Sequence, residues 1–156
     1  MSELTINKTG GGMVYLTAYQ KLFNTNPQPV TDKFRINTWF ERSGNTIAEL
    51  KAGEKTTMKI EINVLADAEY VQIEIPIPAG CTYGEKRQDN WKMHKEFLKN
   101  KAVFFAEKLT KGRYTYELEL EPRYSGSYII NPSKAELMYF PVFYGRNETR
   151  KIAIKK

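Results

Sequence analysis

The sequence predicts an all-β domain, folded as a two-layer antiparallel β-sandwich with little or no helix. Apolar residues alternate with polar residues over segments 34–40, 58–64, 71–77 and 114–121. This period of two is typical of strands with one face on a core and one face in water. Turn-forming residues separate the segments, among them Ser43-Gly44-Asn45, Lys99-Asn100 and Lys111-Gly112. Many short strands at such spacing indicate a sandwich or a barrel.

The alternation also identifies the core. In segment 58–64, for example, Met58, Ile60, Ile62 and Val64 share one face and Lys59, Glu61 and Asn63 share the other. The same reasoning applied along the chain predicts ten mostly buried side chains: Phe34, Ile36, Ile60, Ile62, Ile73, Ile75, Phe105, Tyr116, Leu118 and Ile152.

One region, residues 90–109, allows two interpretations. Trp91, His94, Lys95 and Leu98 have helical spacing. We favour a strand over 93–98 that turns at 99–100 into a second strand over 101–109. The continuous apolar run 103–106 is typical of a strand buried on both faces.

The composition is that of one domain that needs neither a disulfide nor a metal. The 156 residues are 41% hydrophobic with a single cysteine, and a chain of this length buries most of its unfolded surface. We therefore expect a single β-sandwich domain over 1–156, with 1–12 as a leading segment. The polar N-terminus does not resemble a signal peptide. No apolar run reaches the roughly 18 residues of a membrane span.

The net charge of +6 raises the question of nucleic-acid binding. The densest basic stretch, 86–101, is interrupted by Glu85, Asp89 and Glu96. We interpret it as a solvated face and expect no nucleic-acid partner. A phosphate-binding strip would need these charges on one continuous face with aromatics between them.

The sequence offers no catalytic or metal-binding set, so we expect no enzyme and no cofactor. His94, the one histidine, cannot form a zinc cluster alone. Cys81 would need a base and an orienting group to act as a nucleophile. Both are interpreted as ordinary strand residues that do not share a pocket.

The least regular segment is 128–146, which is rich in aromatic residues and contains the four-residue apolar run 137–140. Because this run does not alternate, its side chains belong either to an exposed contact patch or to a strand covered on both faces.

Here the sequence resembles a known family. Ala135-Glu136-Leu137-Met138-Tyr139-Phe140-Pro141 and Tyr144-Gly145-Arg146 resemble the end of the C-terminal macroglobulin-like domain of bacterial α2-macroglobulins. Four other pieces agree in order: Lys8-Thr9-Gly10-Gly11-Gly12-Met13-Val14-Tyr15, Ile75-Pro76-Ile77-Pro78-Ala79-Gly80, the pair 103–109 and 112–116, and 122–128. Residues 85–93 fit the family pattern poorly and are interpreted as a loop.

The resemblance implies an immunoglobulin-like sandwich at the end of a long exported protein of the periplasm or cell envelope that traps proteases. Many members carry an internal thioester, formed by a cysteine with a glutamine three residues on. Cys81 is followed by Thr82, Tyr83 and Gly84, so that bond and the bait region would lie upstream. The expected partners are neighbouring domains and, through them, proteases. We expect a monomer, with any membrane contact through a lipid anchor outside this chain.

The resemblance also implies an interdomain contact made by Met138, with Tyr139 beside it and with Glu136 and Tyr144 in the same motif. A polarizable thioether fills irregular gaps and excludes water without attacking a reactive ester. The alternative function is surface adhesion or carbohydrate binding, which a row of exposed Tyr and Trp with paired carboxylates would favour.

Overall fold

A computed structural model of the chain describes residues 5–17, 24, 26–86 and 93–156, and it confirms the predicted all-β sandwich. Within these residues there are strands and turns but no helix, and hence no helix that could cross a membrane. The strands are β1 (Val30–Thr31), β2 (Phe34–Arg42), β3 (Asn45–Ile47), β4 (Glu49–Lys51), β5 (Thr56–Val64), β6 (Ala68–Pro76), β7 (Cys81–Tyr83), β8 (Met93–Phe97), β9 (Lys101–Leu109), β10 (Gly112–Pro122), β11 (Gly126–Ile130), β12 (Lys134–Leu137), β13 (Phe140–Arg146) and β14 (Arg150–Lys155).

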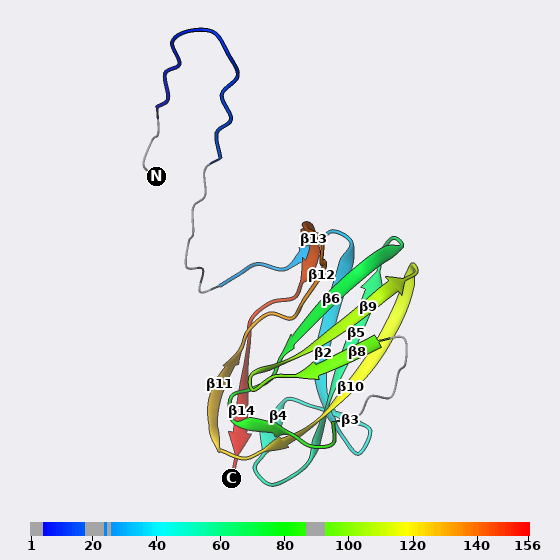
Figure 1. Ribbon diagram of the computed structural model, residues 1–156. Helices are drawn as coiled ribbons and strands as arrows, with labels where there is room; N and C mark the ends of the chain where they lie inside the picture. The colour runs from blue at the N-terminus through cyan, green and yellow to red at the C-terminus, as the bar shows by residue number, and fades with distance from the viewer. Residues whose placement is uncertain (1–4, 18–23, 25, 87–92) are drawn as a thin grey trace.

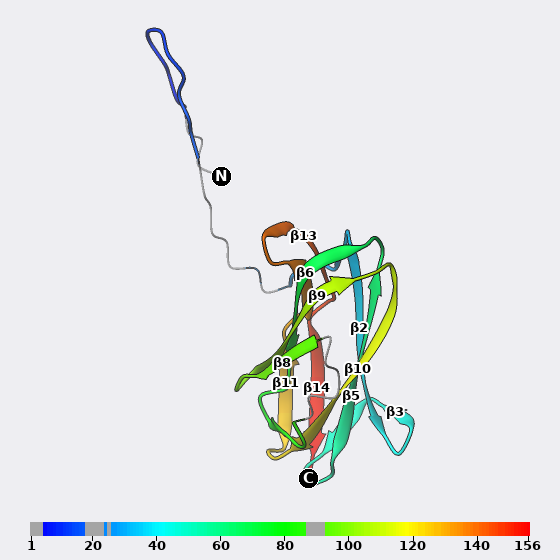
Figure 2. The ribbon, with the colours of Figure 1, turned by 45° about the vertical axis from the view of Figure 1, so that its right-hand side comes forward.

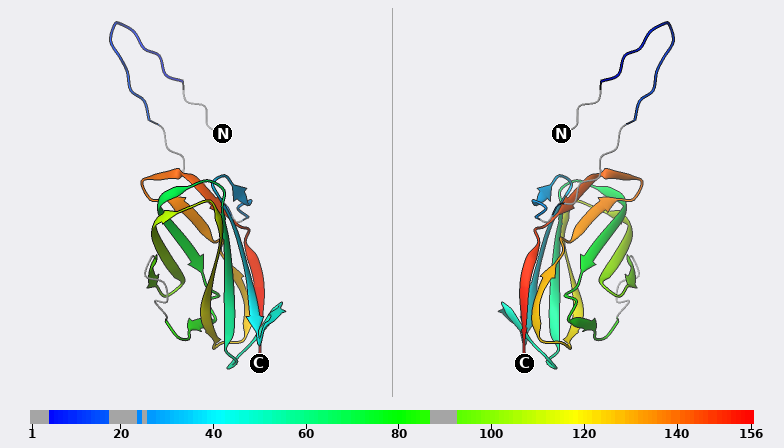
Figure 3. Two further views of the ribbon diagram at one scale, coloured as in Figure 1. Left: turned by 90° about the vertical axis from the view of Figure 1, so that its right-hand side faces the viewer. Right: turned by 90° about the vertical axis from the view of Figure 1, so that its left-hand side faces the viewer.

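Two layers face each other across the core (Figures 1 and 3). One layer is the sheet β1-β13-β12-β6-β9-β8, and the other is the sheet β3-β2-β5-β10-β7. A smaller sheet, β11-β14-β4, lies at the end of the sandwich where the chain terminates. The pairings are antiparallel except β14 with β4, which is parallel.

The core lies where the inward faces of β6 and β9 meet those of β2, β5 and β10. Phe104 of β9 and Tyr116 of β10 join the two layers through an edge-on ring contact, with 5.6 Å between centroids. Nine of the ten predicted core residues are buried: Phe34, Ile36, Ile60, Ile62, Ile73, Ile75, Tyr116, Leu118 and Ile152. The strand interpretation of 93–98 and 101–109 is also confirmed by β8 and β9.

Two predictions about β8 and β9 are wrong. Phe105, predicted to be buried, is half-buried on the outer face of β9, because none of the described strands forms a second layer over that position. Lys95, assigned to a solvated face, is only 4% exposed. It shares the inward face of β8 with Met93, and its ammonium lies 5.6 Å from the centroid of the Phe104 ring. Arg87 and Lys92 of the same basic stretch lie outside the described residues.

The last four strands form two nested antiparallel pairs: β11 pairs with β14, and β12 and β13, which lie between them in the chain, pair with each other. Asn147 and Ser133 link the chain where one pair gives way to the other, through a 3.1 Å backbone bond and a 2.7 Å bond from the Ser133 amide to the Asn147 side chain. The β12–β13 hairpin consequently emerges at the end of the sandwich opposite the C-terminus (Figure 2).

Gly145 fixes how closely β13 approaches β2. A Cβ atom at this position would lie 1.9 Å from the Phe34 carbonyl oxygen, so only glycine allows the two backbones to meet here. This contact anchors the base of the hairpin on the core.

Residues 5–17 lie outside the sandwich and are exposed throughout. The chain bends at Gly10-Gly11-Gly12, with φ of 95° at Gly10 and 111° at Gly12. The stretches that this bend joins do not form paired strands.

Candidate functional site

The candidate site is built on the tip of the β12–β13 hairpin. Leu137 pairs with Phe140, so Met138 and Tyr139 form a two-residue turn. The preceding pair joins Glu136 to Tyr144, which leaves residues 141–143 of β13 without partners in β12. Such a bulge bends a strand and re-aims its side chains. The tip therefore projects as a knob instead of continuing the sheet.

The tip is apolar and open to water. Tyr139 is 69% exposed, Phe140 62% and Val142 74%, while Met138 is 41% exposed. Of the two interpretations of run 137–140, the strand covered on both faces is wrong, because the hairpin reverses within the run. We define the hairpin tip as residues 137–143.

Tyr70 of β6 supports the tip from below. Its φ of 53° is left-handed, a conformation rarely adopted by a large side chain. The left-handed conformation of Tyr70 shifts the inward–outward alternation of β6 by one residue. As a result Ala68 and Val71 both point inward, while Glu69 and Tyr70 both point outward. The Met138 amide donates to the Tyr70 carbonyl over 2.8 Å, and the Tyr70 and Tyr139 rings meet edge-on with 5.2 Å between centroids.

This backbone strain permits a test with a matched pair of variants. Tyr70→Val is expected to destabilise the fold by about 1–2 kcal/mol more than Tyr70→Asn, because asparagine accepts a left-handed conformation and valine does not. Both variants lose the ring contact with Tyr139, so that contact does not contribute to their difference. Urea denaturation gives the two values, and equal stabilities would show that Tyr70 is not held in this conformation.

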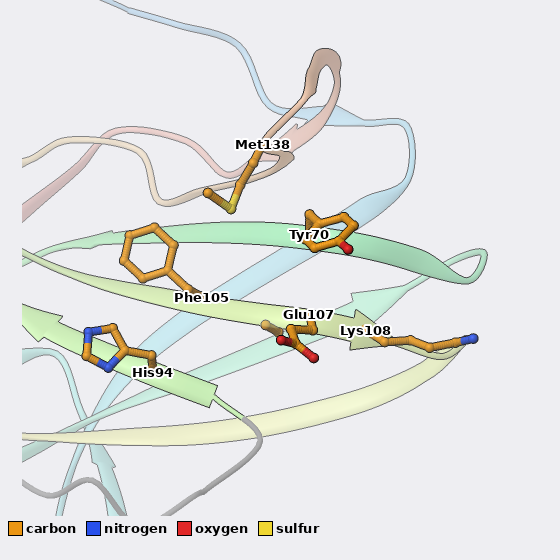
Figure 4. Close-up of a pocket in the computed structure, with 7 residues that line it drawn as sticks. Tyr70, His94, Phe105, Glu107, Lys108 and Met138 are labelled. Atoms are coloured by element: carbon orange, nitrogen blue, oxygen red, sulfur yellow. The ribbon is translucent and has the colours of Figure 1, made fainter.

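A hollow of about 490 Å³ opens beneath Met138 on the outer face of the sheet. Figure 4 shows Met138 and Tyr70 on one side of it, Phe105 as an apolar wall, and His94 and Glu107 on the other side. The His94 and Phe105 rings are nearly parallel, with 6.1 Å between centroids, and the imidazole lies 3.5 Å from the Glu96 carboxylate. A second hollow beside Tyr70 is lined by Lys33, Tyr139 and Phe140 among others.

Glu136 and Tyr144 lie behind the tip, opposite each other across the hairpin. The Glu136 carboxylate pairs with Lys134, and the Lys134 ammonium also lies 5.3 Å from the centroid of the Tyr144 ring. Arg146 covers the same ring at 5.9 Å. The four predicted contact residues therefore share one hairpin, but only Met138 and Tyr139 occupy its exposed turn.

The groups that could do chemistry are placed differently. Cys81 is buried in β7, and this burial raises the pKa of its thiol to about 12, which opposes the thiolate that a nucleophile requires. Among the described residues, no three of His, Cys, Asp and Glu are grouped to hold a metal ion. Trp39, a candidate for carbohydrate stacking, is half-buried, and its indole N–H donates to Glu41 over 2.6 Å. Trp91 lies outside the described residues.

Sequence reasoning found the tip but missed the hollow beside it. The sequence gives Tyr70 and Glu107 no functional signal, predicts Phe105 as a core residue, and predicts His94 as a strand residue, which it is. The one signal in the sequence is the break in alternation at Glu69-Tyr70, where two residues stand between the apolar Ala68 and Val71. In the structure both Glu69 and Tyr70 point outward.

The sequence and the fold of this chain are similar to those of known proteins. Residues 34–141, more than half of the chain, match the family model described as bacterial alpha-2-macroglobulin MG10 domain. No curated protein matches the sequence.

Solved structures give the same picture of the fold. Salmonella alpha-2-macroglobulin reacted with methylamine has a TM-score of 0.74 at 14% identity, covering 85% of this chain and 10% of that one. Native Escherichia coli alpha-2-macroglobulin, from domain MG7 to the C-terminus, has a TM-score of 0.74 at 13% identity, covering 83% and 24%. At these identities the likeness concerns the fold alone. The chain spans less than a quarter of the length of either structure.

Proposed function

Because the chain belongs to the family of bacterial alpha-2-macroglobulin MG10 domains, we propose that it is a non-catalytic domain of a protease-trapping inhibitor. In this proposal it packs against neighbouring domains of a much longer parent chain and helps to hold their resting arrangement. The parent would act in the periplasm or cell envelope.

The exposed hairpin tip is the observation that supports this proposal. Tyr139, Phe140 and Val142 are each more than 60% exposed and lie within four residues of the chain, whereas contiguous apolar patches on soluble monomers are small and commonly functional. Covering such surface contributes roughly 25 cal/mol per Å² before the costs of association. Met138 suits the edge of such a contact, because a flexible thioether adapts to an irregular partner.

The chemistry of the chain agrees with a structural role. A thioester needs a reactive cysteine with a glutamine three residues on, and Cys81 is buried with Gly84 at that position. In the proposal, bond formation with the protease belongs to upstream domains. This domain contributes a water-excluding contact.

We expect residues 137–143 to be covered in the parent protein and exposed in the isolated chain. Their backbone amides should exchange hydrogen at least tenfold more slowly in the parent, measured by mass spectrometry. The double variant Met138→Ala/Tyr139→Ala should remove most of this protection, because it deletes both turn side chains. If the parent carries a thioester, the variant should also react faster with methylamine.

Ile129→Ala provides the control, since Ile129 is 64% exposed on β11 at a distance from the tip. It should leave exchange at 137–143 unchanged. Equal exchange of the tip in the parent and in the isolated chain would contradict an interdomain contact at this place.

A further inference from the structure

The hollow beneath Met138 is lined by two aromatic rings and a thioether. Phe105 and Tyr70 present ring surface to it, and Met138 adds a thioether. All three lie on the water-exposed side of the sheet, at or beside the proposed contact. Its volume of about 490 Å³ is within the range of sites that accept a large side chain or a small ligand.

Glu107 places a carboxylate without a partner among the described residues at the rim of this hollow, which Lys108 also lines. Its carboxylate lies at the rim and forms no ion pair or hydrogen bond with any described residue, in contrast to its acidic neighbours. Glu69 pairs with Lys108 over 3.6 Å, and Glu96 faces the His94 imidazole. Figure 4 shows the Lys108 side chain running along the sheet away from Phe105 and Met138. The cation nearest in sequence is therefore already engaged elsewhere.

We propose that the hollow binds an arginine side chain presented by a neighbouring domain. A planar guanidinium can stack on Phe105 or Tyr70 while its N–H groups donate to the Glu107 carboxylate. Arginine fits better than lysine, because a guanidinium is weakly hydrated and stacks on rings, whereas an ammonium is compact and strongly hydrated. An apolar guest would leave the Glu107 charge without a partner beside a dry contact.

The inference rests on the proposed function for the origin of the guest, but the binding itself can be tested separately. The probe is Nα-acetyl-arginine methylamide, titrated into the 156-residue chain and followed by amide chemical shifts in NMR spectra. Shifts are expected at Ala106, Glu107 and Met138. The citrulline analogue, which has nearly the same shape without the charge, should bind at least about fivefold more weakly.

Two variants complete the test. Glu107→Gln should weaken arginine binding about fivefold while leaving the fold unchanged, since Glu107 is exposed. Glu49→Gln, an exposed carboxylate in β4 that pairs with Lys155 at the far end of the molecule, should have no effect.

The proposal is overturned if arginine produces no localised shifts, if citrulline binds equally well, or if Glu107→Gln binds like the original chain. These results would leave the exchange experiment on residues 137–143 untouched. Conversely, unprotected tip amides in the parent would argue against the interdomain contact without affecting binding of the free probe.

Discussion

Gly145→Ala is expected to lower the free energy of unfolding by about 3 kcal/mol or more. The added methyl group would lie 1.9 Å from the Phe34 carbonyl oxygen and 2.9 Å from its Cβ atom. Both atoms belong to Phe34, the first residue of β2, which is fully buried. Relief of the clash would therefore require β13 to move away from the core, with loss of its pairing to β1 and β12.

Thermal unfolding followed by circular dichroism measures this effect. For a domain of this size the midpoint should fall by about 6–12 °C. Gly11→Ala is the matched control, because a Cβ there meets no atom within 4 Å, and its stability should change by less than about 0.5 kcal/mol. An unchanged midpoint for Gly145→Ala would mean that β13 and β2 are not in close backbone contact.

Met58→Ala is expected to cost about 2–5 kcal/mol, whereas Met138→Ala should cost less than about 1 kcal/mol. The two substitutions delete the same atoms from different surroundings. Met58 of β5 is 0% exposed in the centre of the core, and Met138 is 41% exposed at the tip. Only the first deletion leaves a cavity that the surrounding structure cannot fill.

Urea denaturation of the isolated chain measures both effects. The comparison requires that the free energy of unfolding depend on urea concentration with the same slope in both variants. The comparison of Met58→Ala with Met138→Ala also tests whether Met138 is a contact residue. A residue retained for its contribution to this domain's own stability would be costly to truncate here. A contact residue would be costly only in the parent protein. A loss of several kcal/mol for Met138→Ala would assign Met138 to the core and remove it from the contact.

Some features of the site could be predicted because they depend on local order. The run 137–140 breaks the period of two, and a break in alternation marks either burial on both faces or a reversal of the chain. The sequence could not distinguish these, since both place apolar residues at consecutive positions. In the structure Leu137 pairs with Phe140, which shows that the chain reverses within the run.

The hollow could not be predicted, because its walls come from distant parts of the chain. Tyr70, Phe105 and Met138 meet only because β6 lies between β12 and β9 in the sheet, and strand order depends on how the whole sandwich closes. The wrong prediction for Phe105 has the same origin. A run of apolar residues indicates burial on both faces only where a second layer covers the strand, and no strand among the described residues covers the outer face of β9 at that position.

The amino-acid sequence by itself determined the class of the fold, nine of ten predicted core residues and the strands β8 and β9, because side-chain alternation is a local property of the chain. It also located the apolar segment that becomes the hairpin tip. Tertiary structure alone decided that Lys95 points inward, that Gly145 must have no side chain, and that Glu107 stands at the rim of an aromatic hollow. These three depend on which backbones approach each other across the sandwich, and long-range packing sets that approach.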